Sequence, residues 1–242
     1  MAQSKPDIPP QTYLHSLRGY VCSPIRMGIQ EVEDEVRELK SEKNAFEEFI
    51  EQIMIIETEQ PDNQTVWMQK NDYSQNLDRV RLAYQNTVMS TTHYSDTYGE
   101  SLFENIKAEF SSEIAHALRS NNNHNFTPRL KQTLITGSEQ RIAESIQFVE
   151  RLEMESESLN AALGDLTELI DSLDSTRVPE WYQETFTGEL KQIAADRQEM
   201  LTSMGSIRYV DYHELCEYLY ESCPWTYPIL ISIARFRESI RI

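Results

Sequence analysis

The segment from Thr92 to Glu100 holds the densest group of side chains that could do chemistry. His93, two tyrosines and the carboxylates of Asp96 and Glu100 fall within nine residues. His93 could act as a general base oriented by Asp96, and Tyr94 or Tyr98 could donate a proton. The same residue types also occur at the ends of helical bundles, where they bond to free backbone groups and pack with their polar tips outward. We favour this structural interpretation over catalysis.

A second group, His213, Cys216 and Cys223, offers three possible metal ligands. Their spacing matches no zinc pattern and no clear fourth ligand lies nearby, so buried free cysteines are the favoured interpretation. The chain also has no phosphate-binding glycine loop, no H-E-x-x-H and no G-x-S-x-G. The sequence therefore predicts no metal and no cofactor, and it leans against an enzyme.

Two aromatic residues, Trp225 and Tyr227, lie between Pro224 and Pro228, ahead of an apolar C-terminal segment. They could form a docking surface for another protein, because such side chains give large contact areas at little entropic cost. Packing at the base of a bundle is the alternative that we favour.

Helices must position all of these residues, because helical periodicity is the strongest pattern in the chain. Leucines recur every seven residues, and a second apolar series runs beside them with a break at Ser156. Glycine (7) and proline (9) are scarce and strand signals are poor. The predicted class is all-α, an elongated helical bundle with long antiparallel coiled-coil helices. The four leucines are Leu152, Leu159, Leu166 and Leu173.

The leucine series has two interpretations. It could join two copies of the chain as a zipper. However, further apolar residues flank the series, and the short connection after Asp174 would bring the next helix back antiparallel. We favour a bundle formed within one chain, and dimerisation stays open.

The predicted organisation is a flexible arm over residues 1–22 and a single helical domain over 23–242. Ser23 and Pro24 suit a helix start, as N-cap and first-turn residue, whereas Gly137 and Ser138 could interrupt a helix. We expect long helices at about 24–56, 138–174 and 179–204, and a helical end region at about 73–120 and 209–241.

The net negative charge disfavours nucleic acid as a partner. The net charge is -18, with 40 acidic and 22 basic residues, so the chain should repel nucleic-acid backbones. An acidic, lysine-poor composition suits a salt-rich cytoplasm, although an ordinary acidic helical protein fits it equally well. Three cysteines, no signal peptide and no apolar run of about 18 residues predict a soluble cytoplasmic protein without a membrane span.

Several short motifs carry a resemblance to a known family. They are Tyr84–Met89, His93–Tyr94, Tyr98–Leu102, Glu109–Phe110, Ala115–Leu118, Arg151–Leu152, Glu155, Ser158–Leu159, Glu217–Tyr220, Pro224, Thr226–Pro228 and Leu230. In these motifs the chain resembles a haloarchaeal family of uncharacterised helical proteins, a domain of unknown function. The resemblance implies a salt-loving archaeal source and no particular activity; some relatives in that family add membrane helices, which this chain lacks.

The predicted function is a non-enzymatic protein-interaction or regulatory module. Its partner would be another protein or a second copy of the chain, bound through helices. One alternative is a hydrolase-like enzyme centred on His93, Asp96 and Glu100. A nucleic-acid-associated regulator is a further alternative, and the charge disfavours it.

Overall fold

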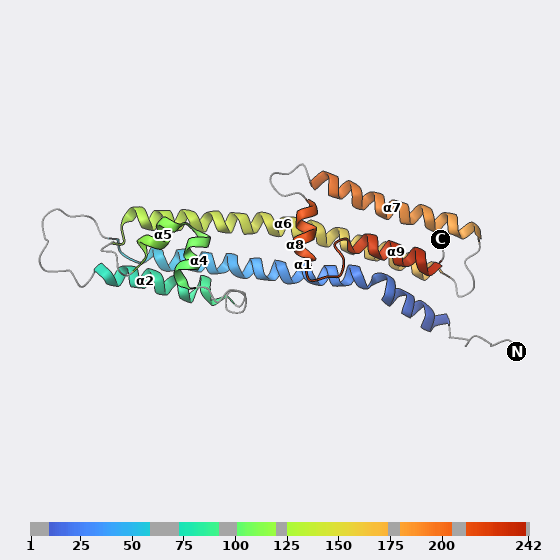
Figure 1. Ribbon diagram of the computed structural model, residues 1–242, viewed down its shortest axis with the longest axis horizontal. Helices are drawn as coiled ribbons and strands as arrows, with labels where there is room; N and C mark the ends of the chain where they lie inside the picture. Colours follow the sequence, from blue (N-terminus) through green and yellow to red (C-terminus); the bar gives the residue numbers. More distant parts are fainter. Residues whose placement is uncertain are drawn as a thin grey trace, which may run out of the picture. The chain divides into compact units, whose positions relative to one another are not determined.

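The computed structural model describes residues 10–58, 73–91, 101–119, 125–173, 180–204 and 212–240 (Figure 1). Every regular element in these ranges is a helix, which confirms the all-α prediction. The α-helices are α1 (Pro10–Met54), α2 (Tyr73–Asn86), α4 (Leu102–Glu109), α5 (Ser112–Ala117), α6 (Pro128–Ser172), α7 (Glu180–Met204), α8 (Tyr212–Leu219) and α9 (Pro228–Ile240), and a short 3-10 helix, η1, covers Val88–Ser90.

The chain divides into two compact units, which are described separately. Unit 1 comprises residues 1–35 and 151–242, and unit 2 comprises residues 36–150. The helices α1 and α6 each contribute one half to each unit.

In unit 1, α1 begins at Pro10, so the helix start predicted at Ser23 and Pro24 is corrected. Pro24 lies inside the helix and has no N–H to bond the carbonyl of Tyr20. Two side chains bond that carbonyl instead: Ser23 Oγ donates to it at 3.3 Å, and Arg235 Nη1 of α9 donates to it at 2.9 Å and to Ser23 Oγ at 2.8 Å. Residues 10–22 of the predicted arm are therefore helical.

The leucine series is buried in unit 1. Leu152, Leu159 and Leu166 are 0% exposed and Leu173 is 7% exposed. The C-terminal half of α6 runs antiparallel to α1, because Arg18 pairs with Asp171 and Cys22 bonds to Thr167. The leucines thus pack into the chain's own core, as the bundle interpretation expects.

The remaining helices of unit 1 pack through large apolar contacts. Phe186 of α7 meets Phe236 of α9 edge to face, with ring centroids 6.0 Å apart. Gly28 of α1 lies close to α9, where an added Cβ would stand 3.2 Å from the Pro228 ring. These contacts bring α7, α9 and α1 into one core.

In unit 2, an aromatic cluster forms the centre of the core. Tyr84 of α2 lies 5.2 Å from the ring of Phe49 and 6.0 Å from that of Phe110. Phe110 also approaches Phe46 and Phe49, at 6.2 and 6.5 Å. The cluster joins the C-terminal half of α1 to α2 and to the turn after α4.

Two helix boundaries in unit 2 follow from capping. Ser101 and Glu104 form a capping box before α4, where the Ser101 N–H donates to Glu104 Oε2 at 2.9 Å. A separate helix, α5, follows α4, because Ser111 caps it and its Oγ accepts a hydrogen bond from the Ile114 N–H at 3.3 Å.

The N-terminal half of α6 also belongs to unit 2. It begins at Pro128, ten residues before the start expected at about 138, and Thr127 Oγ1 accepts a hydrogen bond from the Leu130 N–H at 3.2 Å. The possible interruption at Gly137 is absent, since α6 is continuous through it. Gly137 instead makes room for Phe110, whose ring would lie 2.6 Å from an added Cβ.

Among the described residues, none of the helices combines the length and apolar character that crossing a membrane requires.

Candidate functional site

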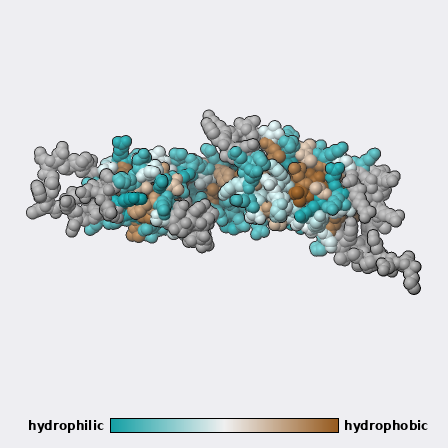
Figure 2. Space-filling model, in the orientation of Figure 1, coloured by the Kyte–Doolittle hydropathy of each residue, from teal (hydrophilic) through white to brown (hydrophobic). Residues whose placement is uncertain are grey.

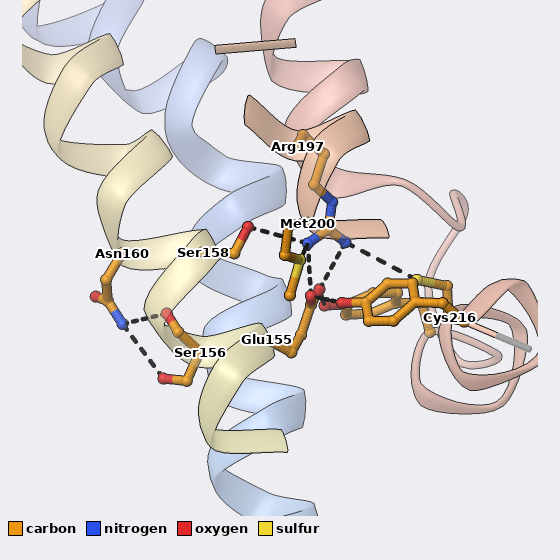
Figure 3. Close-up of polar contacts among 9 residues, drawn as sticks. Glu155, Ser156, Ser158, Asn160, Arg197, Met200 and Cys216 are labelled. Carbon is orange, nitrogen blue, oxygen red and sulfur yellow. Dashed lines mark hydrogen bonds and ion pairs between the residues drawn. The ribbon is translucent and has the colours of Figure 1, made fainter. Parts of the chain in front are cut away.

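A buried ion pair lies in unit 1, between α6 and α7. Glu155 is 0% exposed and Arg197 is 4% exposed. Arg197 donates to both carboxylate oxygens, from Nη1 to Oε2 at 2.6 Å and from Nη2 to Oε1 at 2.9 Å. Figure 3 shows the guanidinium of Arg197 reaching from α7 toward Glu155 on α6. This bidentate geometry is the strongest form of a carboxylate–guanidinium contact.

Two tyrosines complete the coordination of the carboxylate. Tyr212, at the start of α8, donates to Glu155 Oε2, and Tyr220, just after α8, donates to Oε1 at 2.5 Å. The carboxylate therefore accepts four hydrogen bonds, two on each oxygen. We call Glu155, Arg197, Tyr212 and Tyr220 the polar centre; it ties α8 and the turn after it to α6 and α7.

The remaining contacts of Arg197 come from neutral groups. Its Nη1 also donates to Ser158 Oγ at 3.1 Å and contacts Met200 Sδ at 3.2 Å, and its Nη2 contacts Cys216 Sγ at 3.9 Å. The guanidinium lies 5.2 Å from the centroid of the Tyr212 ring, within the range of a cation–π contact. Both ends of the ion pair are thus fully surrounded.

Burial and charge shift the pKa values around the polar centre. Burial and the Glu155 carboxylate raise the pKa of the Cys216 thiol to about 12, and they also raise the pKa of Tyr220. Desolvation would lower the pKa of Arg197, but its bonds to Glu155 outweigh that effect and the pKa is raised. The thiol and the phenol are held neutral beside a neutral ion pair.

The polar centre serves to hold helices in place. A general base needs a free acceptor that a substrate can reach, whereas Glu155 is sealed and accepts from four protein donors. Removing one partner would leave a buried charge uncompensated, which is strongly unfavourable. The centre therefore makes the position of α7 and α8 on α6 specific.

A groove lies beside the polar centre, between the C-terminal half of α6 and α7. One part, of about 390 Å³, reaches from Met154 on α6 to Ile229 on α9. A second part, of about 430 Å³, continues along the same two helices to Ser172. The two parts share Asp165, Ile193 and Asp196, so we treat them as one α6–α7 groove.

The predicted catalytic candidates His93, Asp96, Tyr98 and Glu100 lie outside the described residues. Their interpretation as a catalytic or a structural group stays a prediction.

The three possible metal ligands have separate partners. His213 Nδ1 lies 2.6 Å from the Tyr227 hydroxyl and its Nε2 lies 3.2 Å from Glu217. Cys216 is buried against Arg197, whereas Cys223 contacts Ser222 and Glu31. No group of three or more His, Cys, Asp or Glu side chains suited to a metal occurs in the part of the chain that the structure describes.

The two predicted interaction residues are half-buried and engaged within the chain. Tyr227 stacks on His213 with ring centroids 6.0 Å apart, and Trp225 lies 5.9 Å from the ring of Tyr220. Trp225 thus covers a member of the polar centre. Their use as a docking surface stays a prediction.

Sequence reasoning missed the polar centre, although both charged members carried a signal. Arg197 stands at an apolar position in the heptad pattern of residues 179–204, and Glu155 stands on the flank of the leucine stripe. Two opposite charges at core positions of successive helices indicate a buried pair when they are considered together. Tyr212 and Tyr220 carried no comparable signal.

The fold and the polar centre define an all-helical protein whose interior is specified by a buried ion pair. The sequence matches the model of the family described as Domain of unknown function (DUF7260) over residues 23–242, and the chain belongs to this family. Comparison with curated proteins and with solved structures finds no match.

Proposed function

We propose that this protein is a non-enzymatic interaction module that binds another protein through unit 1. The observation that carries the proposal is the α6–α7 groove, a concave surface with apolar residues on both helices. Concave sites that combine apolar side chains with a few polar ones are where soluble proteins bind ligands and partners. Figure 2 shows apolar surface, in brown, over the part of unit 1 where α7 and α9 lie.

The polar centre also supports the proposal, because it fixes one wall of the groove. Arg197 and Met200 both line the groove and belong to the contacts around Glu155. A groove wall that is fixed by a buried bidentate pair keeps its shape in the free protein, and a preformed surface binds with a smaller loss of entropy. We also propose that the protein works in a reducing cytoplasm, since its three cysteines are unpaired.

Site-specific photo-crosslinking in the native host tests the function. A photoreactive phenylalanine analogue replaces Gln192, an exposed residue that lines the groove. The matched control places the same analogue at Gln198, which is exposed on the same helix and is not among the groove residues. We expect a protein adduct from position 192 and none from position 198.

Mass spectrometry of the adduct then identifies the partner. A different protein supports the proposal, and a second copy of this chain assigns the groove to self-association. No adduct at position 192, or the same adducts at both positions, would contradict an interaction through the groove.

A further inference from the structure

The α6–α7 groove combines an apolar floor with an acidic rim. Ala162, Ile193 and Ile229, which are 5%, 6% and 1% exposed, form its floor together with the exposed Ala161, and Met154 and Met200 lie at one end. Methionine side chains adapt to the shape of a partner and are common at recognition surfaces.

Five carboxylates line the same groove, and all of them are exposed. They come from both helices, and two of them, Asp165 and Asp196, line both parts. The other three are Glu157, Glu168 and Glu189. The rim therefore creates a negative potential along the length of the groove.

The one basic residue among those that line the groove does not offset this potential. It is Arg197, whose guanidinium is paired with the Glu155 carboxylate and is 4% exposed. A buried neutral pair contributes little field outside the protein. An occupant of the groove must therefore bring its own positive charge.

The length of the groove indicates the kind of occupant. Its lining runs on α6 from Met154 to Ser172 and on α7 from Glu189 to Met200. At 1.5 Å per residue these spans correspond to about 27 Å and about 17 Å. A helix of about three to five turns fits such a trough, and an amphipathic helix would lay its apolar face on the floor.

Resting on the proposed function, we propose that the α6–α7 groove binds a cationic amphipathic α-helix of another protein. Lysine or arginine residues on both flanks of that helix meet the carboxylates of α6 and α7, and its apolar residues cover Ala161 and Ile193. The charge pattern selects against acidic helices and against nucleic acid, because like charges along the rim repel both.

The probe for this proposal is a fluorescent 18-residue peptide of leucine and lysine with helical amphipathic order. Two control peptides are a shuffled peptide of the same composition, which has no apolar face, and a leucine–glutamate peptide of the same pattern. Binding to the full-length protein is followed by fluorescence anisotropy at moderate salt, since the rim charges are screened at high salt. We expect the amphipathic cationic peptide alone to bind.

Two matched double variants separate the groove from general charge attraction. Asp165→Asn with Asp196→Asn neutralises two rim carboxylates, and Glu199→Gln with Glu214→Gln makes the same charge change at exposed positions outside the groove. We expect the rim variant to weaken the binding of the peptide about ten-fold, and the control variant to weaken it less than about two-fold. Equal losses, or binding of the shuffled peptide, would overturn the proposal.

A third variant tests the apolar floor. Ala161 is exposed, so Ala161→Trp fills the groove without entering the core. We expect it to abolish peptide binding while the helical circular dichroism stays unchanged; retained binding would overturn the proposal. A crosslinked partner at position 192 without a cationic helix would overturn this inference and leave the proposed function standing, whereas no crosslink would remove both.

Discussion

Unit 1 and unit 2 are built around different halves of the same two long helices, but they fix their shorter helices by different interactions. Unit 2 centres on the rings of Phe49, Tyr84 and Phe110. Unit 1 adds to its apolar core the fully buried pair of Glu155 and Arg197. Apolar contact tolerates rearrangement, whereas a buried charge accepts only an arrangement that supplies its partner.

The buried polar contacts of unit 2 sharpen the contrast. The Tyr84 hydroxyl donates to Asn105 Oδ1 at 2.6 Å, and Arg81 donates from Nη1 to the Leu118 carbonyl at 2.6 Å. The first bond joins two neutral side chains, and the second joins Arg81 to the backbone. Arg81 also pairs with Asp78, but the Asp78 side chain is 63% exposed, so this ion pair is open to solvent on one side. We infer that unit 2 is specified mainly by shape and unit 1 also by charge.

The largest loss of stability is expected from Phe49→Ala, which removes the ring at the centre of the unit 2 core. Phe49 is 0% exposed and contacts both other rings of the cluster. A cavity of this size lowers the free energy of unfolding by about 3–5 kcal/mol. Hydrogen exchange should show faster opening of α2 and α4 while α7 and α8 keep their protection. Equal loss of protection in α7 and α8 would mean that the two units open together.

Glu155→Gln is the corresponding change in unit 1. The amide keeps the shape of the side chain but leaves the Arg197 charge buried without compensation, so we expect a loss of about 3 kcal/mol in denaturant unfolding. The matched control, Glu157→Gln, changes an exposed residue two positions away and should shift stability by less than about 0.5 kcal/mol.

A double variant tests whether charge or packing is the cause. Glu155→Leu with Arg197→Met removes both charges and keeps apolar volume, and we expect it to recover most of the stability lost in Glu155→Gln. A double variant as unstable as the single one would show that the tyrosine hydrogen bonds matter more than the ion pair.

Substituting alanine for two glycines of α6 should change the stability by smaller amounts, in opposite directions. Gly137→Ala in unit 2 drives a Cβ into the Phe110 ring, 2.6 Å away, and should cost about 1–3 kcal/mol. Gly164→Ala in unit 1 meets nothing within 4 Å and should stabilise the helix by about 0.5–1 kcal/mol. Thermal unfolding monitored by circular dichroism measures both; a gain from Gly137→Ala would contradict the close packing against Phe110.

A pH dependence of stability is expected in unit 1 only above about pH 9. The Cys216 thiol has an ordinary pKa of 9.0 in the unfolded chain and about 12 in the folded one. Its contribution to stability is therefore present below about pH 9 and is lost as the pH rises through about 12. Cys216→Ala should flatten the decline of stability over this interval more than Cys223→Ala does; identical profiles would contradict the shift.

Periodicity predicted the long helices well, because regular apolar spacing sustained over many turns is typical of a packed helix. The start of α1 was wrong for a specific reason. Ser23 and Pro24 fit an N-cap and first turn, but the same proline is accommodated inside a helix when another group bonds the freed Tyr20 carbonyl. Ser23 Oγ bonds it within the same turn, at 3.3 Å, but the closer donor, Arg235, lies too far along the sequence to enter a local argument.

The polar centre escaped prediction because its members are separated in sequence. Glu155 and Arg197 are 42 residues apart, and Tyr220 is 65 residues from Glu155. Each charged residue alone resembles a break in an apolar stripe. Only the register between α6 and α7 pairs them, and that register follows from the packing of the whole unit.

The freed carbonyl in α1 has a consequence for the order of assembly. The Tyr20 carbonyl accepts from Ser23 Oγ at 3.3 Å within the same turn, and its shorter bond comes from Arg235, 215 residues further along the chain. During synthesis, α1 emerges long before α9 exists, so only Ser23 and water can bond this carbonyl while the intervening chain is made. Contacts of such large sequence separation form late and slow the folding of a domain. The turn at Pro24 is therefore completed only when unit 1 joins its first helix to α9.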